Sequence, residues 1–225
     1  MDIRFEQAEA RFDGRVALHP LTLALSENRI GVIGLNGSGK TTFVRMINGL
    51  VTPAAGRVTV NGHDTVKDAD RVRGETGFIF QNPQNQIILP ILKEDIALGL
   101  KSRKLRKQDT DAAVEAVLAR FGIAHLGDRR AHELSGGELQ LAALASVLVT
   151  RPGILIMDEP TNQLDLRNRG LVERTIHGLS ENVIVISHDL DLIAGFDRLL
   201  LFHQGRLAAD GAPADVISRY RELAA

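Results

Sequence analysis

The stretch Gly34-Leu-Asn-Gly-Ser-Gly-Lys-Thr-Thr42 decides the fold of this chain. It matches the pattern GxxxxGK[ST], whose glycines let the backbone turn tightly around an anion with its N–H groups pointing inward. Residues 29–33 predict a buried strand before it, and a helix is expected over residues 40–49. The helix N-terminus adds a favourable dipole for phosphate. Because the spacing is not the GxGxxG of a dinucleotide-binding turn, the stretch predicts a loop for a nucleoside triphosphate.

Individual residues of this phosphate loop have distinct expected roles. Lys40 should reach the β- and γ-phosphates, and Thr41 should offer its hydroxyl to Mg²⁺, so ATP and Mg²⁺ are the expected ligands. A glycine turn in a structural loop is the alternative, and the strand and helix on either side argue against it. The loop residues expected to contact the nucleotide are Leu35, Asn36, Gly37, Ser38, Gly39, Lys40, Thr41 and Thr42.

Two carboxylates end a second apolar run. Residues 154–157 predict a central strand, and Asp158 and Glu159 follow it at once. The carboxyl end of such a strand is where α/β sheets bind ligands, and neighbouring strand residues point in opposite directions. We therefore expect Asp158 to hold the magnesium shell beside Thr41, and Glu159 to polarise the attacking water as general base. A pair of solvated acids at a strand end is the alternative.

The remaining patterns predict an α/β fold with an antiparallel β part and a helical insertion. Residues 3–6, 21–25 and 56–61 are expected to form antiparallel strands, the last closed by the hairpin turn Asn61-Gly62. Further strands are expected at 76–80, 183–187 and 199–202, and helices at 109–121, 137–149 and 213–223. We expect a single domain, 1–225, with a core of residues 1–81 and 151–225 and a helical part of residues 82–150.

Composition excludes several classes of protein. Cysteine is absent, so disulfides, thiolate metal sites and a cysteine nucleophile are excluded. The net charge of −1 argues against a protein that coats nucleic acid. The longest apolar run, residues 141–149 with Ser146 interrupting it, is far shorter than the roughly 20 residues of a spanning helix. The N-terminus lacks the apolar segment of a signal peptide. We expect a cytoplasmic protein that reaches a membrane through a partner.

A third motif, Leu134-Ser-Gly-Gly-Glu138, precedes a very apolar helix. Ser135 is placed as its N-cap, and Gly136 and Gly137 leave backbone N–H groups uncovered at the helix start, which makes a second anion site. By itself, this stretch favours the alternative of an ordinary Ser-Gly helix cap. Together, the phosphate loop, Gln81, this signature, Asp158-Glu159, Asp165 and His188 resemble the ATPase domain of ABC transporters over essentially the whole chain.

The resemblance implies roles that the spacing alone does not. It implies a head-to-tail dimer with a second copy or a homologous ATPase, in which Ser135, Gly136 and Gly137 of one chain close on the γ-phosphate held by the other. Asp165 then couples the two sites. Phe12 lies where the family places an aromatic residue that stacks on adenine, with a core position as the alternative. The implied catalytic residues are Lys40, Gln81, Glu159 and His188, and the implied metal ligands are Thr41, Gln81 and Asp158.

Residues 80–86, Phe-Gln-Asn-Pro-Gln-Asn-Gln, resemble the ATPases of energy-coupling-factor (ECF) importers. This resemblance implies a transmembrane coupling subunit and a substrate-binding membrane subunit as partners, no nucleic acid, and a peripheral location at the cytoplasmic face of a bacterial membrane. A plain Pro-Asn turn is the alternative. The residues expected to meet a partner helix are the amides Asn82, Asn85 and Gln86 and the apolar Ile87, Ile88, Leu89, Ile91 and Leu92.

Within the ECF group, the compact length and residues 134–149 resemble the biotin importer's ATPase, with cobalt, nickel or other vitamin importers as alternatives. A soluble ABC protein of translation or DNA repair is less consistent, because neither a second ATPase half nor a coiled-coil insertion is seen. Glu159 and His188 argue against a regulatory module without turnover. Glu138 departs from the family's commoner glutamine and leaves dimer affinity open. The basic cluster Lys101, Arg103, Lys104, Arg106 and Lys107 is interpreted as a solvated connection, with anionic lipid or the transmembrane subunit as alternative contacts.

Overall fold

The computed structural model describes residues 1–224, which divide into two compact units. The first unit comprises residues Met1–Gly77, Gly153–Glu159 and Glu181 onward, and the second comprises Phe78–Pro152 and Pro160–Ser180. Among the described residues, no helix combines the length and apolar character that crossing a bilayer requires.

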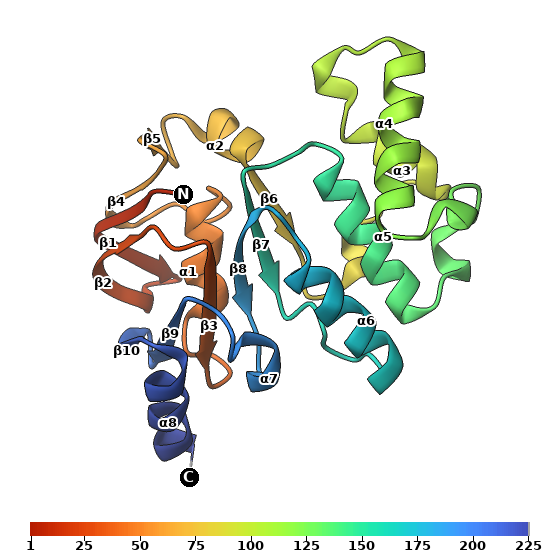
Figure 1. Ribbon diagram of the computed structural model, residues 1–225. Coiled ribbons are helices and arrows are strands. Elements are labelled where there is room, and N and C mark those ends of the chain that lie inside the picture. The colour runs from red at the N-terminus through yellow and green to blue at the C-terminus, as the bar shows by residue number, and fades with distance from the viewer. Residues whose placement is uncertain (225) are drawn as a thin grey trace. The chain divides into compact units, whose positions relative to one another are not determined.

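A 4-stranded antiparallel sheet forms one part of the first unit (Figure 1). Its strand order is β2-β1-β4-β5, from β1 (Ile3–Phe12), β2 (Arg15–Leu25), β4 (Ala55–Val60) and β5 (His63–Asp64). Asn61 and Gly62 have φ of 49° and 83°, which is the predicted hairpin turn. β1 and β2 are longer than predicted because Asp13 and Gly14, with φ of 48° and 78°, form a second hairpin turn that was not predicted.

A 6-stranded sheet, of order β10-β9-β3-β8-β7-β6, carries the phosphate loop. Strands β3 (Arg29–Gly34), β7 (Ile154–Asp158), β8 (Asn182–Ile186) and β9 (Arg198–His203) are parallel, and β10 (Arg206–Gly211) is antiparallel to β9. Strand β6 (Thr76–Ile79) begins in the first unit, and its residues after Gly77 belong to the second unit. Because β3, β8 and β7 are neighbours, the residues that follow their carboxyl ends meet at one edge.

Four helices belong to the first unit: α1 (Lys40–Ile47), α2 (Ala69–Glu75), α7 (Leu190–Ile193) and α8 (Pro213–Ala224). Phe43 of α1 packs between Phe5 of β1 and Phe202 of β9, with ring centroids 4.8 Å apart in both pairs. This aromatic stack fixes the helix that begins at the phosphate loop against strands of both sheets. α1 ends two residues before the predicted end, and Gly49 beyond it has the left-handed φ of 70°.

The second unit is helical. Its helices are α3 (Leu92–Leu98), α4 (Lys107–Arg120), α5 (Gly136–Leu148) and α6 (Leu166–His177), with 3₁₀ turns η1 (Pro83–Asn85), η2 (Lys101–Arg103), η3 (Ala124–Leu126) and η4 (Ala131–Glu133). α5 is largely buried and contacts α3, α4 and α6. The observed division therefore differs from the expected 1–81, 82–150 and 151–225, because residues 78–81 and α6 group with the helical unit.

Candidate nucleotide-binding site

The phosphate loop connects β3 to α1, and its three glycines have φ of 146° (Gly34), 75° (Gly37) and 100° (Gly39). A Cβ on Gly34 would overlap the carbonyl oxygen of Phe202, and one on Gly39 would lie 2.8 Å from that of Ala17. Around Gly37, no described atom lies within 4 Å of such a Cβ. The outer glycines therefore pack the loop onto its own unit, whereas the middle one leaves room for a ligand.

Lys40 folds back over this loop. Its Nζ donates hydrogen bonds to the carbonyl oxygens of Gly34 (2.7 Å) and Leu35 (2.9 Å). Burial lowers the pKa of Lys40, and the charges of Glu159 and Asp158 oppose that shift. The hydroxyl of Ser38 is buried and has no hydrogen-bond partner among the described residues. An anion in the loop would satisfy both groups, so the loop fits a phosphate chain.

Thr41 and Asp158 form the candidate metal site. Thr41 Oγ1 lies 3.5 Å from Asp158 Oδ1, and the Asp158 side chain is buried. Burial raises the pKa of Asp158, whereas the hydrogen bond from Thr41 and the charges of Arg45 and Lys40 lower it. A hydroxyl and a carboxylate side by side are oxygen ligands that Mg²⁺ takes together with phosphate oxygens and water. The residues present therefore fit Mg²⁺, whose charge would compensate the buried carboxylate.

Glu159, His188 and Asn36 meet beside this pair. His188 Nε2 lies 3.0 Å from Glu159 Oε1 and 3.2 Å from Asn36 Oδ1. Burial raises the pKa of Glu159, and the charges of His188 and Lys40 oppose that rise. A raised pKa makes the carboxylate a stronger base, which suits proton abstraction from water.

The backbone of Glu159 is held in a costly conformation. Its φ is 55°, in the left-handed region that a glutamate seldom adopts. Its N–H donates to the carbonyl of Ile186 over 2.9 Å, which fixes the residue to the end of β8. Such strain persists only where surrounding structure imposes it, and it is found most often at functional sites.

Phe12 ends β1 and is 49% exposed, so it is not a core residue. With Asp13, Arg15, Val16 and Ala17 it lines a cavity of about 510 Å³. The approach of the Ala17 carbonyl to Gly39 places this cavity next to the phosphate loop. An aromatic ring and an apolar side chain at that place fit a purine base. Of the other loop residues, Leu35 is exposed and Thr42 is half-buried.

The signature residues lie in the second unit, where Ser135 caps α5. Its N–H and its hydroxyl donate to the same carboxylate oxygen of Glu138, over 2.8 Å and 2.7 Å, and its Oγ accepts from the Glu138 N–H at 3.5 Å. Together these bonds form a capping box. Glu138, which the sequence marks only as a departure from the family, thus occupies the helix start.

Asn168 is a residue that the sequence analysis missed. A Cβ on Gly137 would lie 2.5 Å from Cγ and 2.8 Å from Cβ of Asn168, so this glycine allows α5 to approach α6 closely. Asp165 is the N-cap of α6: its Oδ1 accepts from the Asn168 N–H (2.8 Å) and its Oδ2 from Asn168 Nδ2 (3.0 Å). Asn168 therefore connects the signature to Asp165, and no motif singles it out.

Gln81 is exposed in the second unit, just after β6. The neighbouring Asn82 accepts a hydrogen bond from the Gln84 N–H (3.0 Å), and Gln86 Oε1 accepts one from the Phe80 N–H (3.4 Å). Two of the three amides expected to face a partner are thus already used to shape the loop. Asn85 stays exposed.

The apolar segment after this loop needs one correction. Leu92 is fully buried in the core, because it opens α3 and packs inward, whereas Ile88 is 75% exposed. Asp95, which the sequence did not indicate, is buried, and its Oδ1 accepts from the N–H groups of Ile88 (2.7 Å) and Leu89 (2.9 Å). One carboxylate therefore fixes the exposed segment to α3.

The phosphate loop, the acidic pair and the histidine at one sheet edge place the chain among the P-loop nucleoside triphosphatases. The chain matches the ABC transporter family over residues 18–162, and it belongs to that family as an ATPase subunit. It is 68% identical, over the full length of both chains, to the biotin transport ATP-binding protein BioM of Rhizobium etli.

Two further proteins are similar. The energy-coupling factor transporter ATP-binding protein EcfA1 of Halalkalibacterium halodurans is 37% identical over 201 residues, 87% of this chain and 72% of the relative. The structure of cbiO1 from Clostridium perfringens, part of the ABC transporter complex cbiONQ, has a TM-score of 0.86 at 28% identity and covers 98% of this chain and 93% of that one.

Proposed function

We propose that this chain binds ATP with Mg²⁺ and hydrolyses it to drive an ECF-type importer for biotin. The observation that carries the hydrolytic part is the contact of His188 with both Glu159 and Asn36, beside the loop that holds Lys40. The identity to a biotin transport ATP-binding protein supports biotin over cobalt, nickel or another vitamin as the solute.

Each residue then has a definite task. Lys40 and the loop N–H groups hold the phosphates, and Phe12 with Val16 holds the base. Asp158 and Thr41 hold Mg²⁺, which when bound draws charge from the phosphate oxygens. Glu159 accepts a proton from the attacking water, and its raised pKa strengthens it as a base. His188 keeps the Glu159 carboxylate in place, and Asn36 fixes the imidazole ring.

The second unit supplies the partner contacts in this proposal. Ser135, Gly136 and Gly137 close the nucleotide site of another copy of the chain, as a head-to-tail dimer requires. Gln81 links the nucleotide site to the membrane partners, and the exposed Ile88 with its neighbours meets the transmembrane subunit at the cytoplasmic face of the membrane. The rigid attachment of this segment to Asp95 supports such a role, because a docking surface needs a fixed backbone.

The variant Glu159→Gln tests the base. We expect ATP affinity to be retained, hydrolysis to fall by about 10²–10⁴-fold and an ATP-dependent dimer to accumulate in size-exclusion chromatography. Glu115→Gln, an exposed carboxamide change in α4, is the matched control. Hydrolysis by Glu159→Gln at the wild-type rate would refute the assignment, and Lys40→Ala is expected to lose ATP affinity in calorimetry.

A second experiment tests the solute. Membrane subunits that co-purify with the tagged chain are reconstituted in vesicles, and uptake of labelled biotin, cobalt and nickel is measured with ATP. Biotin uptake that disappears with Glu159→Gln supports the proposal. Uptake of a metal ion in place of biotin contradicts the solute while leaving the ATPase assignment standing.

A further inference from the structure

A cationic and apolar surface joins α3 to α4 in the second unit. Over residues 101–107 the chain carries five cations and no acid. Leu98 and Leu105, on either side of η2, are 38% and 44% exposed. These two leucines line a groove of about 350 Å³ together with Leu89, Leu100, Lys101, Lys104 and one acidic residue, Glu94. We name this surface, residues 98–106 with Leu89, the leucine-lysine face.

The arginines of this segment are already engaged within the unit. Arg103 donates to the carbonyl oxygen of Thr150, and Arg106 forms an ion pair with Asp109 at 2.8 Å. In contrast, Lys101 and Lys104 have no ion pair among residues 1–224. The charges left available on the leucine-lysine face are therefore lysine ammonium groups, which lack the planar fork that fits one carboxylate.

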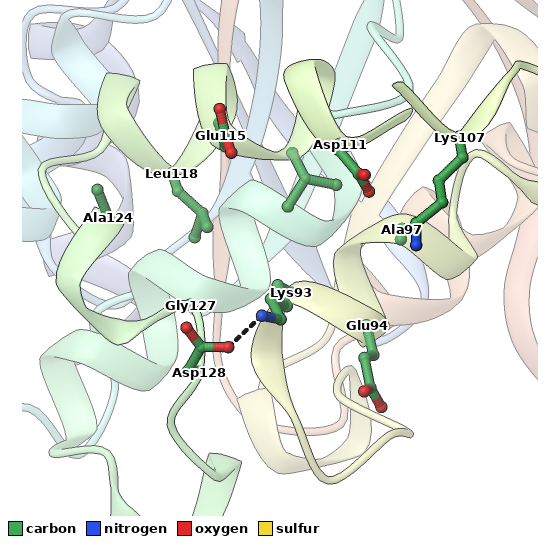
Figure 2. A pocket seen from close by; sticks show the side chains of 11 residues that line it. Lys93, Glu94, Ala97, Lys107, Asp111, Glu115, Leu118, Ala124, Gly127 and Asp128 are labelled. Atoms are coloured by element: carbon green, nitrogen blue, oxygen red, sulfur yellow. Dashed lines mark ion pairs between the residues drawn. The ribbon is translucent and has the colours of Figure 1, made fainter. Parts of the chain in front are cut away.

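A second groove, which shares Glu94 and Ala97 of α3 with the first, carries more carboxylates (Figure 2). There Lys93 pairs with Asp128, Asp111 and Glu115 project from α4, and Lys107 is directed toward the same groove. The two grooves differ in composition: the second has four carboxylates and two lysines, whereas the first has one carboxylate, Glu94, with Lys101 and Lys104. The leucine-lysine face therefore has a net positive charge, because its two unpaired lysines outnumber the one carboxylate of the groove.

We propose that the leucine-lysine face binds the headgroup region of an anionic lipid bilayer. Exposed leucines beside lysines are the composition of segments that lie in a membrane interface, where apolar groups enter the acyl boundary and ammonium groups meet lipid phosphates. Leu89 also belongs to the segment assigned above to the transmembrane subunit, so the same side of the unit would face the membrane. An acidic protein segment is the less favoured occupant, since the arginines suited to carboxylates are already bound.

Vesicle flotation of the isolated chain tests this proposal. The probes are vesicles of phosphatidylcholine alone and of phosphatidylcholine mixed with phosphatidylglycerol, at low and physiological salt. We expect the chain to float with the anionic vesicles and to be released by salt. Each cation near an anionic leaflet raises the vesicle partition coefficient roughly fivefold. The double variant Lys101→Gln/Lys104→Gln should therefore lower the partition coefficient by about 25-fold. The double variant Leu98→Ser/Leu105→Ser should also lower the partition coefficient, although the net charge of the chain is unchanged.

The double variant Lys67→Gln/Arg71→Gln removes two exposed cations from the first unit and is the matched control. Equal partition of wild-type chain into both kinds of vesicle would overturn the proposal, as would equal loss in the control. If the lysine variant keeps its vesicle binding but no longer co-purifies with a membrane subunit, the face binds protein and the lipid assignment is wrong. ATP hydrolysis is not involved, so this inference and the proposed ATPase function can fail separately.

Discussion

Replacing Gly137 by alanine tests whether this signature glycine serves packing in addition to the phosphate binding proposed for it. The added Cβ would lie 2.5 Å from Cγ and 2.8 Å from Cβ of Asn168. These two atoms are close to the backbone of α6, so a change of side-chain rotamer cannot relieve the whole overlap. Gly136, its neighbour in the same motif, is the matched control. A Cβ there meets only Leu164 Cδ2 at 3.3 Å, the end of a flexible side chain.

The magnitudes follow from these contacts. Overpacking of a close contact costs about 1–3 kcal/mol, and any shift of Asn168 also weakens its hydrogen bonds to Asp165, each worth about 1 kcal/mol. In both variants, alanine in place of a helical glycine stabilises the folded state by about 0.5–1 kcal/mol. We therefore expect Gly137→Ala to be destabilised by roughly 1–2 kcal/mol and Gly136→Ala to be neutral or slightly stabilised.

Thermal unfolding followed by circular dichroism measures the difference. Since 1 kcal/mol corresponds to about 2–4 °C in a chain of this size, Gly137→Ala should melt roughly 2–8 °C below Gly136→Ala. In an Asn168→Gly background, which removes the clashing atoms, the penalty of Gly137→Ala should largely disappear. Equal melting temperatures for the two alanine variants would refute the packing argument, as would an unchanged penalty in the Asn168→Gly background.

Three further predictions concern single side chains. Because burial raises the pKa of Asp158, the folded chain binds its proton more tightly than the unfolded chain, so stability falls as pH rises from the ordinary value of 3.8 through the raised one. Without nucleotide, Asp158→Asn should therefore melt a few degrees higher at neutral pH, while losing Mg²⁺-dependent hydrolysis; an unchanged pH profile of Tm would contradict this. Asp95→Ala should expose the amides of Ile88 and Leu89 to faster hydrogen exchange, since two charge-assisted bonds of about 1.5–3 kcal/mol each are lost, and unchanged protection would be evidence against the anchor. Phe12→Ala should weaken ATP binding by about 5–150-fold, the equivalent of 1–3 kcal/mol of stacking, whereas Phe12→Trp should retain it in calorimetry.

Short-range sequence patterns were sufficient to predict the strands, the loop and the helix that form the candidate nucleotide-binding site. The glycine spacing at 34–39 and the apolar runs before it and before Asp158 predict a strand, a loop and a helix from short-range chemistry alone, and the structure has them. The dipeptide Asp13-Gly14 is also typical of a hairpin turn, and the structure has a turn there that was not predicted. This dipeptide predicts the turn between Phe12 and Arg15.

By itself, the sequence determined the order of the elements and the chemical groups that they present, because turns, caps and apolar periodicity act over a few residues. It could not decide which distant groups touch. Strand order and helix packing decided three such contacts. They are the contact of Glu159 with His188, the close approach of Asn168 to Gly137, and the hydrogen bonds that Asp95 accepts from the segment before α3. Those contacts depend on how sheets and helices fill space together, and no short stretch of sequence encodes that packing.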